Sequence, residues 1–160
     1  MLLARLTSHA VRAPRGAGRA RLLAAGSTGA DGTSAGELEM HKYHAVANRT
    51  LESLQERMEA MIDEGDDDGS DVDFSGDVLN LTLSGHGTFV LNKQAPNKQI
   101  WLSSPVSGPQ RYDLDVGCLD WLNTRDGAPL GAVLSRDIAQ LTKREVRFDV
   151  RQAVEDAWRS

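Results

Sequence analysis

Residues 92–113 have the sequence NKQAPNKQIWLSSPVSGPQRYD, which predicts the centre of a β-sheet. Three segments in and beside this stretch alternate between apolar and polar side chains, as strands with one buried face do. The alternating segments are 88–94, 99–103 and 110–113. Pro96 and Asn97 predict a turn between the first two segments, and the run 105–109, with its prolines and glycine, predicts a turn before the third. The stretch therefore predicts three consecutive antiparallel strands.

Alternation assigns the side chains of these strands to two faces of different character. One face is apolar and supplies a core: Phe89, Leu91, Ile100, Leu102 and Tyr112. The other face is mainly polar: Val90, Asn92, Gln94, Gln99, Trp101, Ser103 and Arg111. An indole surrounded by amides and a guanidinium is typical of a protein-binding hot spot, so Trp101 is a candidate anchor for a partner. The alternative is that a loop covers Trp101 and that the amides cap turns.

The segments on either side of this sheet predict two amphipathic helices. Within 39–64, apolar residues recur at spacings of three and four. These residues are Tyr43, Ala47, Leu51, Leu54, Met58 and Met61. A second helix with the same periodicity is predicted over 130–141. The tail 145–160 carries Phe148, Val150, Val154 and Trp158, which we expect to pack back between the two helices.

Further strands are predicted at 72–74, 78–83 and 118–123, the last of which carries Trp121 as a core residue. The order of elements predicts an α+β fold. It is a two-layer sandwich, with an antiparallel sheet of five to six strands and two helices packed on one face. The helices are expected to leave the Trp101 face open.

Carboxylates form a row on a different side of the first predicted helix. The row is Glu52, Glu56, Glu59 and Asp63, and the following loop and strand add Glu64, Asp66, Asp67, Asp68, Asp71 and Asp73. Like charges at helical spacing destabilise a helix by a few tenths of a kcal/mol per pair, about 0.2–0.5. Such an exposed ridge would collect hard cations weakly, because nothing encloses them. The alternative is a plain solvated face. We also expect Gly65 to end this helix in the left-handed conformation.

The histidines and the cysteine suggest little further metal chemistry. His41 and His44 lie three residues apart on the predicted helix and are a candidate metal-binding pair, but the Glu-x-x-His pattern of di-iron proteins is absent there. The single Cys118 excludes an intramolecular disulfide, a multi-cysteine zinc site and a cysteine-ligated cluster within one chain. No basic residue stands beside Cys118 in the sequence to activate its thiol.

Charge divides the 160 residues into two unequal parts. Residues 1–35 hold five arginines and one acid, a net +4, and because the whole chain carries −5, residues 36–160 carry −9. A basic leader poor in acids is typical of an organelle transit peptide, with a disordered tail as the alternative. We expect residues 1–36 to be a transit peptide and linker and 37–160 to be the domain, with its core at about 43–150. The charge of −9 argues against nucleic acid and anionic membranes as partners and in favour of cations or basic protein surfaces.

The stretch 92–113 closely resembles the signature of the frataxins, without a gap. The resemblance extends over about 43–150 and includes Tyr43-His44, the segment 50–54, and Trp121 with Asp126-Gly127. It implies the same two-layer sandwich and a location in the mitochondrial matrix, with the plastid as the less favoured choice. Frataxins act in iron–sulfur cluster assembly and bind iron weakly.

The resemblance also implies two sites. The positions Asn92, Gln94, Trp101 and Arg111 match the sheet-face residues that contact the cysteine desulfurase and the iron–sulfur scaffold protein. The positions Glu52, Glu56, Glu59, Asp63, Asp71 and Asp73 match the acidic ridge that binds iron. Less certain iron ligands are Glu64, Asp66, Asp67, Asp68 and His44. The ridge departs from the family pattern at Asn48 and Arg49, where some relatives have acids, and Cys118 inherits no role.

The predicted function is thus an allosteric activator of the desulfurase–scaffold complex that also acts as an Fe(II) chaperone, with roles in iron homeostasis and haem synthesis. A monomer is expected, with an iron-dependent oligomer as the alternative. The enzymatic alternative is a ferroxidase and iron-storage oligomer, which oxidises Fe(II) with O2. A third alternative is an acidic interaction domain unrelated to iron.

Overall fold

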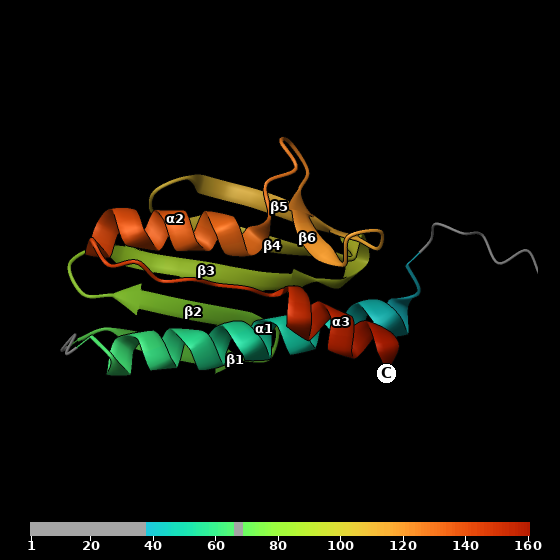
Figure 1. Ribbon diagram of the computed structural model, residues 1–160, viewed down its shortest axis with the longest axis horizontal. Coiled ribbons are helices and arrows are strands. Elements are labelled where there is room, and N and C mark those ends of the chain that lie inside the picture. Colours follow the sequence, from blue (N-terminus) through green and yellow to red (C-terminus); the bar gives the residue numbers. More distant parts are fainter. Residues whose placement is uncertain (1–37, 66–68) are drawn as a thin grey trace, which may run out of the picture. The chain divides into compact units, whose positions relative to one another are not determined.

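The computed structural model describes residues 38–65 and 69–160 (Figure 1). Its helices are α1 (Met40–Asp63), α2 (Leu130–Thr142) and α3 (Arg151–Arg159). Its strands are β1 (Asp71–Ser75), β2 (Val78–Leu83), β3 (Gly87–Gln94), β4 (Gln99–Ser104), β5 (Gly108–Asp115) and β6 (Asp120–Asn123). A short 3-10 turn, η1 (Ala95–Asn97), joins β3 to β4. The predicted leader and the carboxylates of Asp66, Asp67 and Asp68 lie outside the described residues.

The six strands form one antiparallel sheet in which every strand pairs with its neighbour in sequence, in the order β1-β2-β3-β4-β5-β6. This confirms the predicted antiparallel sheet, at the upper end of the expected strand number. The turn 105–107 connects β4 to β5, and Gly108, which begins β5, has a φ of 74°. Only glycine adopts this conformation without steric cost, so the hairpin that carries Trp101 and Arg111 depends on it.

Helices α1 and α2 lie on one side of the sheet, and the connection after α2 returns between them to α3 (Figure 1). The buried side chains are those that the alternation predicts, among them Phe89, Leu91, Ile100, Leu102 and Tyr112. On the opposite face the side chains of Thr82, Thr88, Ser103, Arg111 and Asp113 are exposed. The two-layer α+β sandwich with one open sheet face is therefore confirmed.

The polar groups that enter the core find partners there. Trp121 is fully buried, as predicted, and its indole nitrogen donates to Thr50 Oγ1 at 3.0 Å. Thr50 in turn donates to the carbonyl oxygen of Val46 at 2.8 Å, within α1. The hydroxyl of Tyr43 donates to the carbonyl oxygen of Gln99 at 2.8 Å and so ties α1 to the start of β4. Because these donors are satisfied, the large aromatic residues are buried without leaving an orphaned polar group.

The prediction of two helices was wrong by one, because the tail folds into α3. The predicted packing of the tail does occur: Phe148, Val150 and Val154 are buried, and Trp158 is half-buried against the core. The rest of the apolar side of α3 is made by Ala153 and Ala157, whose small side chains weaken the sequence signal of a nine-residue helix. No helix within 38–65 and 69–160 is long and apolar enough to cross a membrane.

The expectation for Gly65 was also wrong. Helix α1 ends at Asp63, its C-cap Glu64 is right-handed with φ −70°, and Gly65 is not among the residues with positive φ. Instead, a Cβ at this position would overlap the guanidinium of Arg144. Arg144 donates to the carbonyl oxygen of Met61 at 3.2 Å and so caps the end of α1 from the segment after α2. The glycine provides room for this cap rather than a left-handed turn.

Candidate functional site

The strand register brings three of the four predicted partner-binding residues into one row on the open face. Asn92 of β3 pairs with Trp101 of β4, and Trp101 pairs with Arg111 of β5. Gln94 lies in the adjacent row, opposite Gln99, and its amide nitrogen donates to Asn92 Oδ1 at 3.0 Å. The sequence-predicted residues of the sheet face therefore form one contiguous patch.

The indole of Trp101 is only partly buried, and hydrogen bonds and stacking fix its position. Its Nε1 donates to Gln99 Oε1 at 2.8 Å, and Gln99 Nε2 donates to Asp113 Oδ1 at 2.8 Å. The guanidinium carbon of Arg111 lies 4.6 Å from the centroid of the Trp101 ring, within the range of a cation–π contact. An aromatic side chain that is already oriented loses less conformational entropy when a partner covers it.

The amides on this face do not cap turns. Gln94 and Gln99 bond to the side chains of Asn92, Trp101 and Asp113, all of which lie on the open face. The side chains thus form a network parallel to the sheet surface, with Trp101 near its centre. Such an arrangement suits a protein-binding anchor surrounded by directional donors and acceptors.

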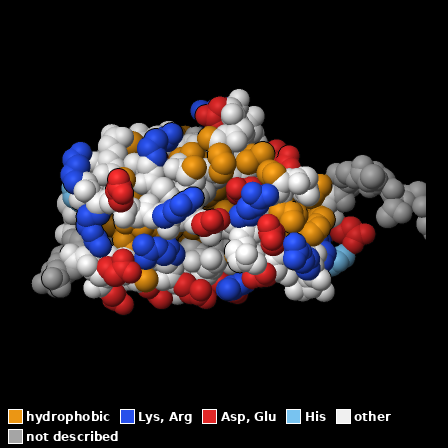
Figure 2. Space-filling model, in the orientation of Figure 1, with side chains coloured by type: hydrophobic (Ala, Val, Ile, Leu, Met, Phe, Trp, Pro, Cys, Tyr) orange, Lys and Arg blue, Asp and Glu red, His pale blue; other side chains and the backbone are white. Residues whose placement is uncertain are grey.

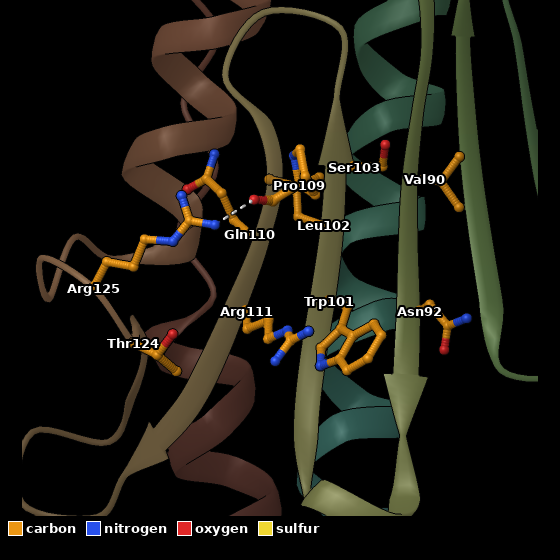
Figure 3. Close-up of a pocket in the computed structure, with 10 residues that line it drawn as sticks. All are labelled: Val90, Asn92, Trp101, Leu102, Ser103, Pro109, Gln110, Arg111, Thr124 and Arg125. Atoms are coloured by element: carbon orange, nitrogen blue, oxygen red, sulfur yellow. Dashed lines mark hydrogen bonds between the residues drawn. The ribbon is translucent and has the colours of Figure 1, made fainter.

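A pocket of about 550 Å³ opens beside the indole (Figure 3). Its lining is Val90, Asn92, Trp101, Leu102, Ser103, Pro109, Gln110, Arg111, Thr124 and Arg125. Sequence reasoning missed Pro109, Gln110, Thr124 and Arg125 as pocket residues. Thr124 and Arg125 follow β6, and strand alternation does not determine where a loop side chain points. Arg125 is placed by a hydrogen bond from its Nη2 to the carbonyl oxygen of Pro109, at 3.4 Å.

A buried carboxylate anchors the hairpin that carries this pocket. Asp137 of α2 is fully buried and accepts hydrogen bonds from Ser104 Oγ at 2.7 Å and from the hydroxyl of Ser107. Its other oxygen accepts from Arg136 Nε at 3.0 Å and Nη2 at 2.8 Å. Ser104 Oγ also accepts from the backbone nitrogens of Val106 and Ser107. The turn between β4 and β5 is therefore fastened to the helix layer beneath it.

The acidic row on α1 is exposed, as predicted, and Asp and Glu side chains gather along the lower edge of the molecule in Figure 2, but part of the row is paired within the domain. Arg49 Nη1 lies 3.7 Å from Glu52 and 3.5 Å from Glu56, and Gln55 donates to Glu59 at 2.8 Å. Arg49 stands where the resemblance places acids in some relatives, so this chain neutralises part of its ridge. These pairs are exposed to solvent and contribute little to stability.

Asp71 and Asp73 lie on the edge strand β1 and not on the helix. Their partners in β2 are Thr82 and Asn80, so both carboxylates are on the open face of the sheet. Asn80 Nδ2 donates to Asp73 Oδ2 at 3.4 Å. A small pocket of about 240 Å³ has Glu59, Asp63 and Asp71 among its lining residues and so joins the end of α1 to the start of β1.

Three of the six predicted iron ligands thus border one hollow. Within the described residues, however, no three His, Cys, Asp or Glu side chains are close enough together to hold one metal ion. Glu64, a less certain candidate, faces Arg57 at 3.5 Å. The ring centroid of His44 lies 5.3 Å from that of Tyr43, with the two rings tilted, and His41 lies 3.3 Å from Glu39. The described part of the ridge therefore presents open, exposed carboxylates rather than an enclosed cluster of ligands.

Cys118 lies in the turn before β6. Partial burial raises the pKa of its thiol, and the neighbouring carboxylate of Asp115 raises it further. Asp115 accepts hydrogen bonds from the backbone nitrogens of Gly117 and Cys118 at 2.9 Å each, which lowers the pKa of Asp115. A thiol with a raised pKa is a poor nucleophile at neutral pH.

The fold is that of the frataxins. A solved structure of yeast frataxin matches with a TM-score of 0.58 and 36% identity, over 72% of this chain and 96% of that chain. The crystal structure of trimeric frataxin from Saccharomyces cerevisiae, complexed with ferrous iron, matches with a TM-score of 0.56 and 37% identity, over 62% of this chain and 87% of that chain.

The sequence comparisons agree. The family model for the frataxin-like domain matches residues 36–144, and the chain belongs to this family. Mitochondrial frataxin from Arabidopsis thaliana is 43% identical over 69% of this chain, and the mitochondrial frataxin homologue from Schizosaccharomyces pombe is 38% identical over 71%. The matches span 59% and 72% of the lengths of these two relatives. The names of the relatives support the predicted location: the chain is mitochondrial.

Proposed function

We propose that this chain acts in mitochondrial iron–sulfur cluster assembly, as an allosteric activator of the cysteine desulfurase–scaffold complex in the matrix. The observation that carries the proposal is the fixed, partly exposed indole of Trp101, on a sheet face that none of the helices in the described part of the chain covers. On this proposal the transit peptide within residues 1–36 directs import and is removed, and the domain 37–160 binds the complex.

The proposed docking assigns a task to each residue of the patch. Trp101 supplies the apolar contact, because its ring is already held by Gln99 and Arg111. Asn92, Gln94 and Arg111 surround it with groups that can donate to a partner's backbone or acidic side chains. Partner binding through this face leaves α1 and its carboxylates uncovered, so a second, cation-binding task can proceed at the same time.

We propose that this second task is weak binding of Fe(II), taken as cargo rather than as a resident cofactor. The hollow bordered by Glu59, Asp63 and Asp71 supports it, as does the yeast relative whose structure holds ferrous iron. Exposed carboxylates are acceptable ligands for Fe(II), but they do not select it over other divalent cations. Weak binding suits an iron donor and links the domain to iron homeostasis and haem synthesis.

The test is a pull-down of residues 37–160 with the desulfurase–scaffold complex, with and without Fe(II), followed by a desulfurase assay. Trp101→Ala should weaken binding by more than about 1 kcal/mol, as truncations at hot spots do, and leave the fold intact. A Thr88→Ala variant is a matched control, because Thr88 is exposed on the same sheet at a distance from the indole patch. Normal binding and stimulation by the Trp101 variant would refute the sheet-face proposal.

The second candidate is a ferroxidase and iron-storage oligomer. It is favoured by one observation, that the yeast relative with ferrous iron was solved as a trimer. Oxygen uptake with Fe(II) separates the two functions when the wild type is compared with a variant in which Glu52, Glu56, Glu59 and Asp63 are neutralised. A difference in rate, together with a mass increase on addition of iron, would favour the oligomer. Equal rates would remove the ridge as a catalytic centre.

A further inference from the structure

The pocket beside Trp101 carries two positive charges and, among the described residues that line it, no negative one. The charges belong to Arg111 of β5 and to Arg125, which follows β6 (Figure 3). The surrounding domain has the opposite character, since residues 36–160 carry a net charge of −9. A cationic hollow on an anionic domain favours partners that bring negative charge to this one place.

Neither guanidinium of the pocket forms an ion pair within residues 38–65 and 69–160. Five other arginines do pair with carboxylates: Arg49, Arg57, Arg136, Arg151 and Arg159. Arg111 stacks on the Trp101 ring, and Arg125 makes a single long hydrogen bond to a carbonyl oxygen. A guanidinium has five N–H donors, so Arg111 and Arg125 keep most of these donors available for a ligand.

The pocket also has an apolar part, which narrows the class of ligand. Val90, Trp101 and Pro109 line it next to the two charges. A free inorganic anion would use the guanidiniums and leave this apolar surface in water. A protein segment with an acidic residue beside an apolar one would use both.

We infer that the pocket binds an acidic side chain of the partner protein, an Asp or Glu whose apolar neighbour packs against Trp101. Arg125 is then a specificity-determining residue beyond the four predicted from the sequence. The inference rests on the proposed function, because the partner is the desulfurase–scaffold complex. The carboxylate accepts hydrogen bonds from Arg111 and Arg125, and the other charges of the domain repel acidic segments elsewhere.

The test compares two substitutions of Arg125 with a charge reversal at an arginine in the helix layer. Arg125→Gln removes the charge and Arg125→Glu reverses it, and Arg147→Glu is the control. Arg147 is exposed in the connection between α2 and α3 and makes no ion pair within the described part of the chain, so it matches the change in net charge. Binding of the domain to the desulfurase–scaffold complex is measured by calorimetry at low and high salt, with Trp101→Ala as the reference and thermal melts to confirm folding.

Arg125→Gln should raise the Kd roughly tenfold, since a hydrogen bond to a charged group contributes about that factor, and Arg125→Glu should raise it further. Arg147→Glu should leave the Kd within about twofold at high salt, where long-range charge effects are screened. In the Arg125 variants, neutralising one acidic residue of the scaffold should cause no additional loss, although it weakens binding of the wild type.

Two results would overturn the inference and leave the proposed function standing. One is wild-type affinity of Arg125→Glu while Trp101→Ala loses binding. The other is an equal loss for Arg125→Glu and Arg147→Glu, which would reveal a net-charge effect without a pocket. Wild-type affinity for both Trp101→Ala and Arg125→Glu would overturn the docking face itself, and with it the inference.

Discussion

Replacing Asp137 with alanine tests whether the buried carboxylate fastens the β4–β5 hairpin to α2. The carboxylate is fully buried, and one of its oxygens accepts from Ser104 Oγ, whose residue is 5% exposed. In the variant this hydroxyl loses its acceptor in a site that water reaches poorly. An unsatisfied buried donor costs about 1–3 kcal/mol, and the lost hydrogen bond to a charged group contributes a similar amount.

The second carboxylate oxygen of Asp137 contributes less to stability, because its partner Arg136 is mostly exposed and is hydrated by water when the carboxylate is removed. We therefore expect Asp137→Ala to lower the free energy of unfolding by about 3–5 kcal/mol, a large fraction of the stability of a small domain. Chemical denaturation followed by tryptophan fluorescence measures this quantity, provided that the slope with denaturant stays constant.

The Ser104→Ala variant and the double variant complete a thermodynamic cycle with Asp137→Ala. The Ser104–Asp137 contact predicts a coupling of about 1–3 kcal/mol between the two positions. A loss below about 1 kcal/mol for Asp137→Ala, or additive effects in the cycle, would refute the anchoring role. A stable Asp137→Ala variant that binds the partner normally would further show that fastening the turn 105–107 to α2 is not needed to position the pocket.

Three further predictions concern other contacts. Gly131→Ala should destabilise the domain by about 1–3 kcal/mol or more in denaturant titrations, because the added Cβ overlaps the carbonyl oxygen of Phe148. The control Ala132→Gly, at an exposed neighbouring position, should cost only about 1 kcal/mol. Gln99→Ala should weaken partner binding several-fold in calorimetry and leave the melting temperature unchanged, because the Trp101 indole loses its acceptor on the surface. A lower melting temperature with unchanged binding would instead assign Gln99 a structural role. Burial raises the pKa of Tyr112 to about 12, so the unfolded chain loses this proton at a lower pH than the folded chain does. The free energy of unfolding should therefore fall from about pH 10 upward, and this fall should be less steep in the Tyr112→Phe variant.

The sheet was predictable because its signal is local. Phe89, Leu91, Ile100 and Leu102 alternate with polar residues, and the prolines and glycine of the turns fix where each strand ends. Register follows from these constraints, because a slip of one residue would turn the core residues to solvent. The placement of Asn92, Trp101 and Arg111 in one row on the open face was predictable for the same reason.

The missed features depend on contacts between distant segments. Arg125 reaches the pocket from a loop, and Gly65 leaves room for Arg144, far along the chain, to cap α1. The carboxylate of Asp137 is buried in a helix whose sequence pattern is amphipathic, and its partners Ser104 and Ser107 lie in a distant segment of the chain. Periodicity within one segment carries no information about such pairings.

The register also distinguishes between the carboxylates that were predicted as one ridge. Asp73 pairs with Asn80, which pairs with Val90, and Val90 pairs with Ser103, so one row crosses the open face from the edge strand to the pocket. Three strand spacings separate the ends of this row, about 14 Å. A partner docked over Trp101 would therefore lie near Asp73, while Glu52 and Glu56 of α1 belong to the other layer.

This arrangement decides which acids could pass iron to a docked partner under the proposed function. Asp71 and Asp73 share the face that the partner would cover, and Asp71 also borders the hollow that Glu59 and Asp63 line. Glu52 and Glu56 pair with Arg49 instead. Neutralising Asp71 and Asp73 should thus reduce iron-dependent stimulation of cluster synthesis more than neutralising Glu52 and Glu56 does, at equal binding of the partner. The reverse order would mean that iron acts from the helix layer and does not move along the sheet.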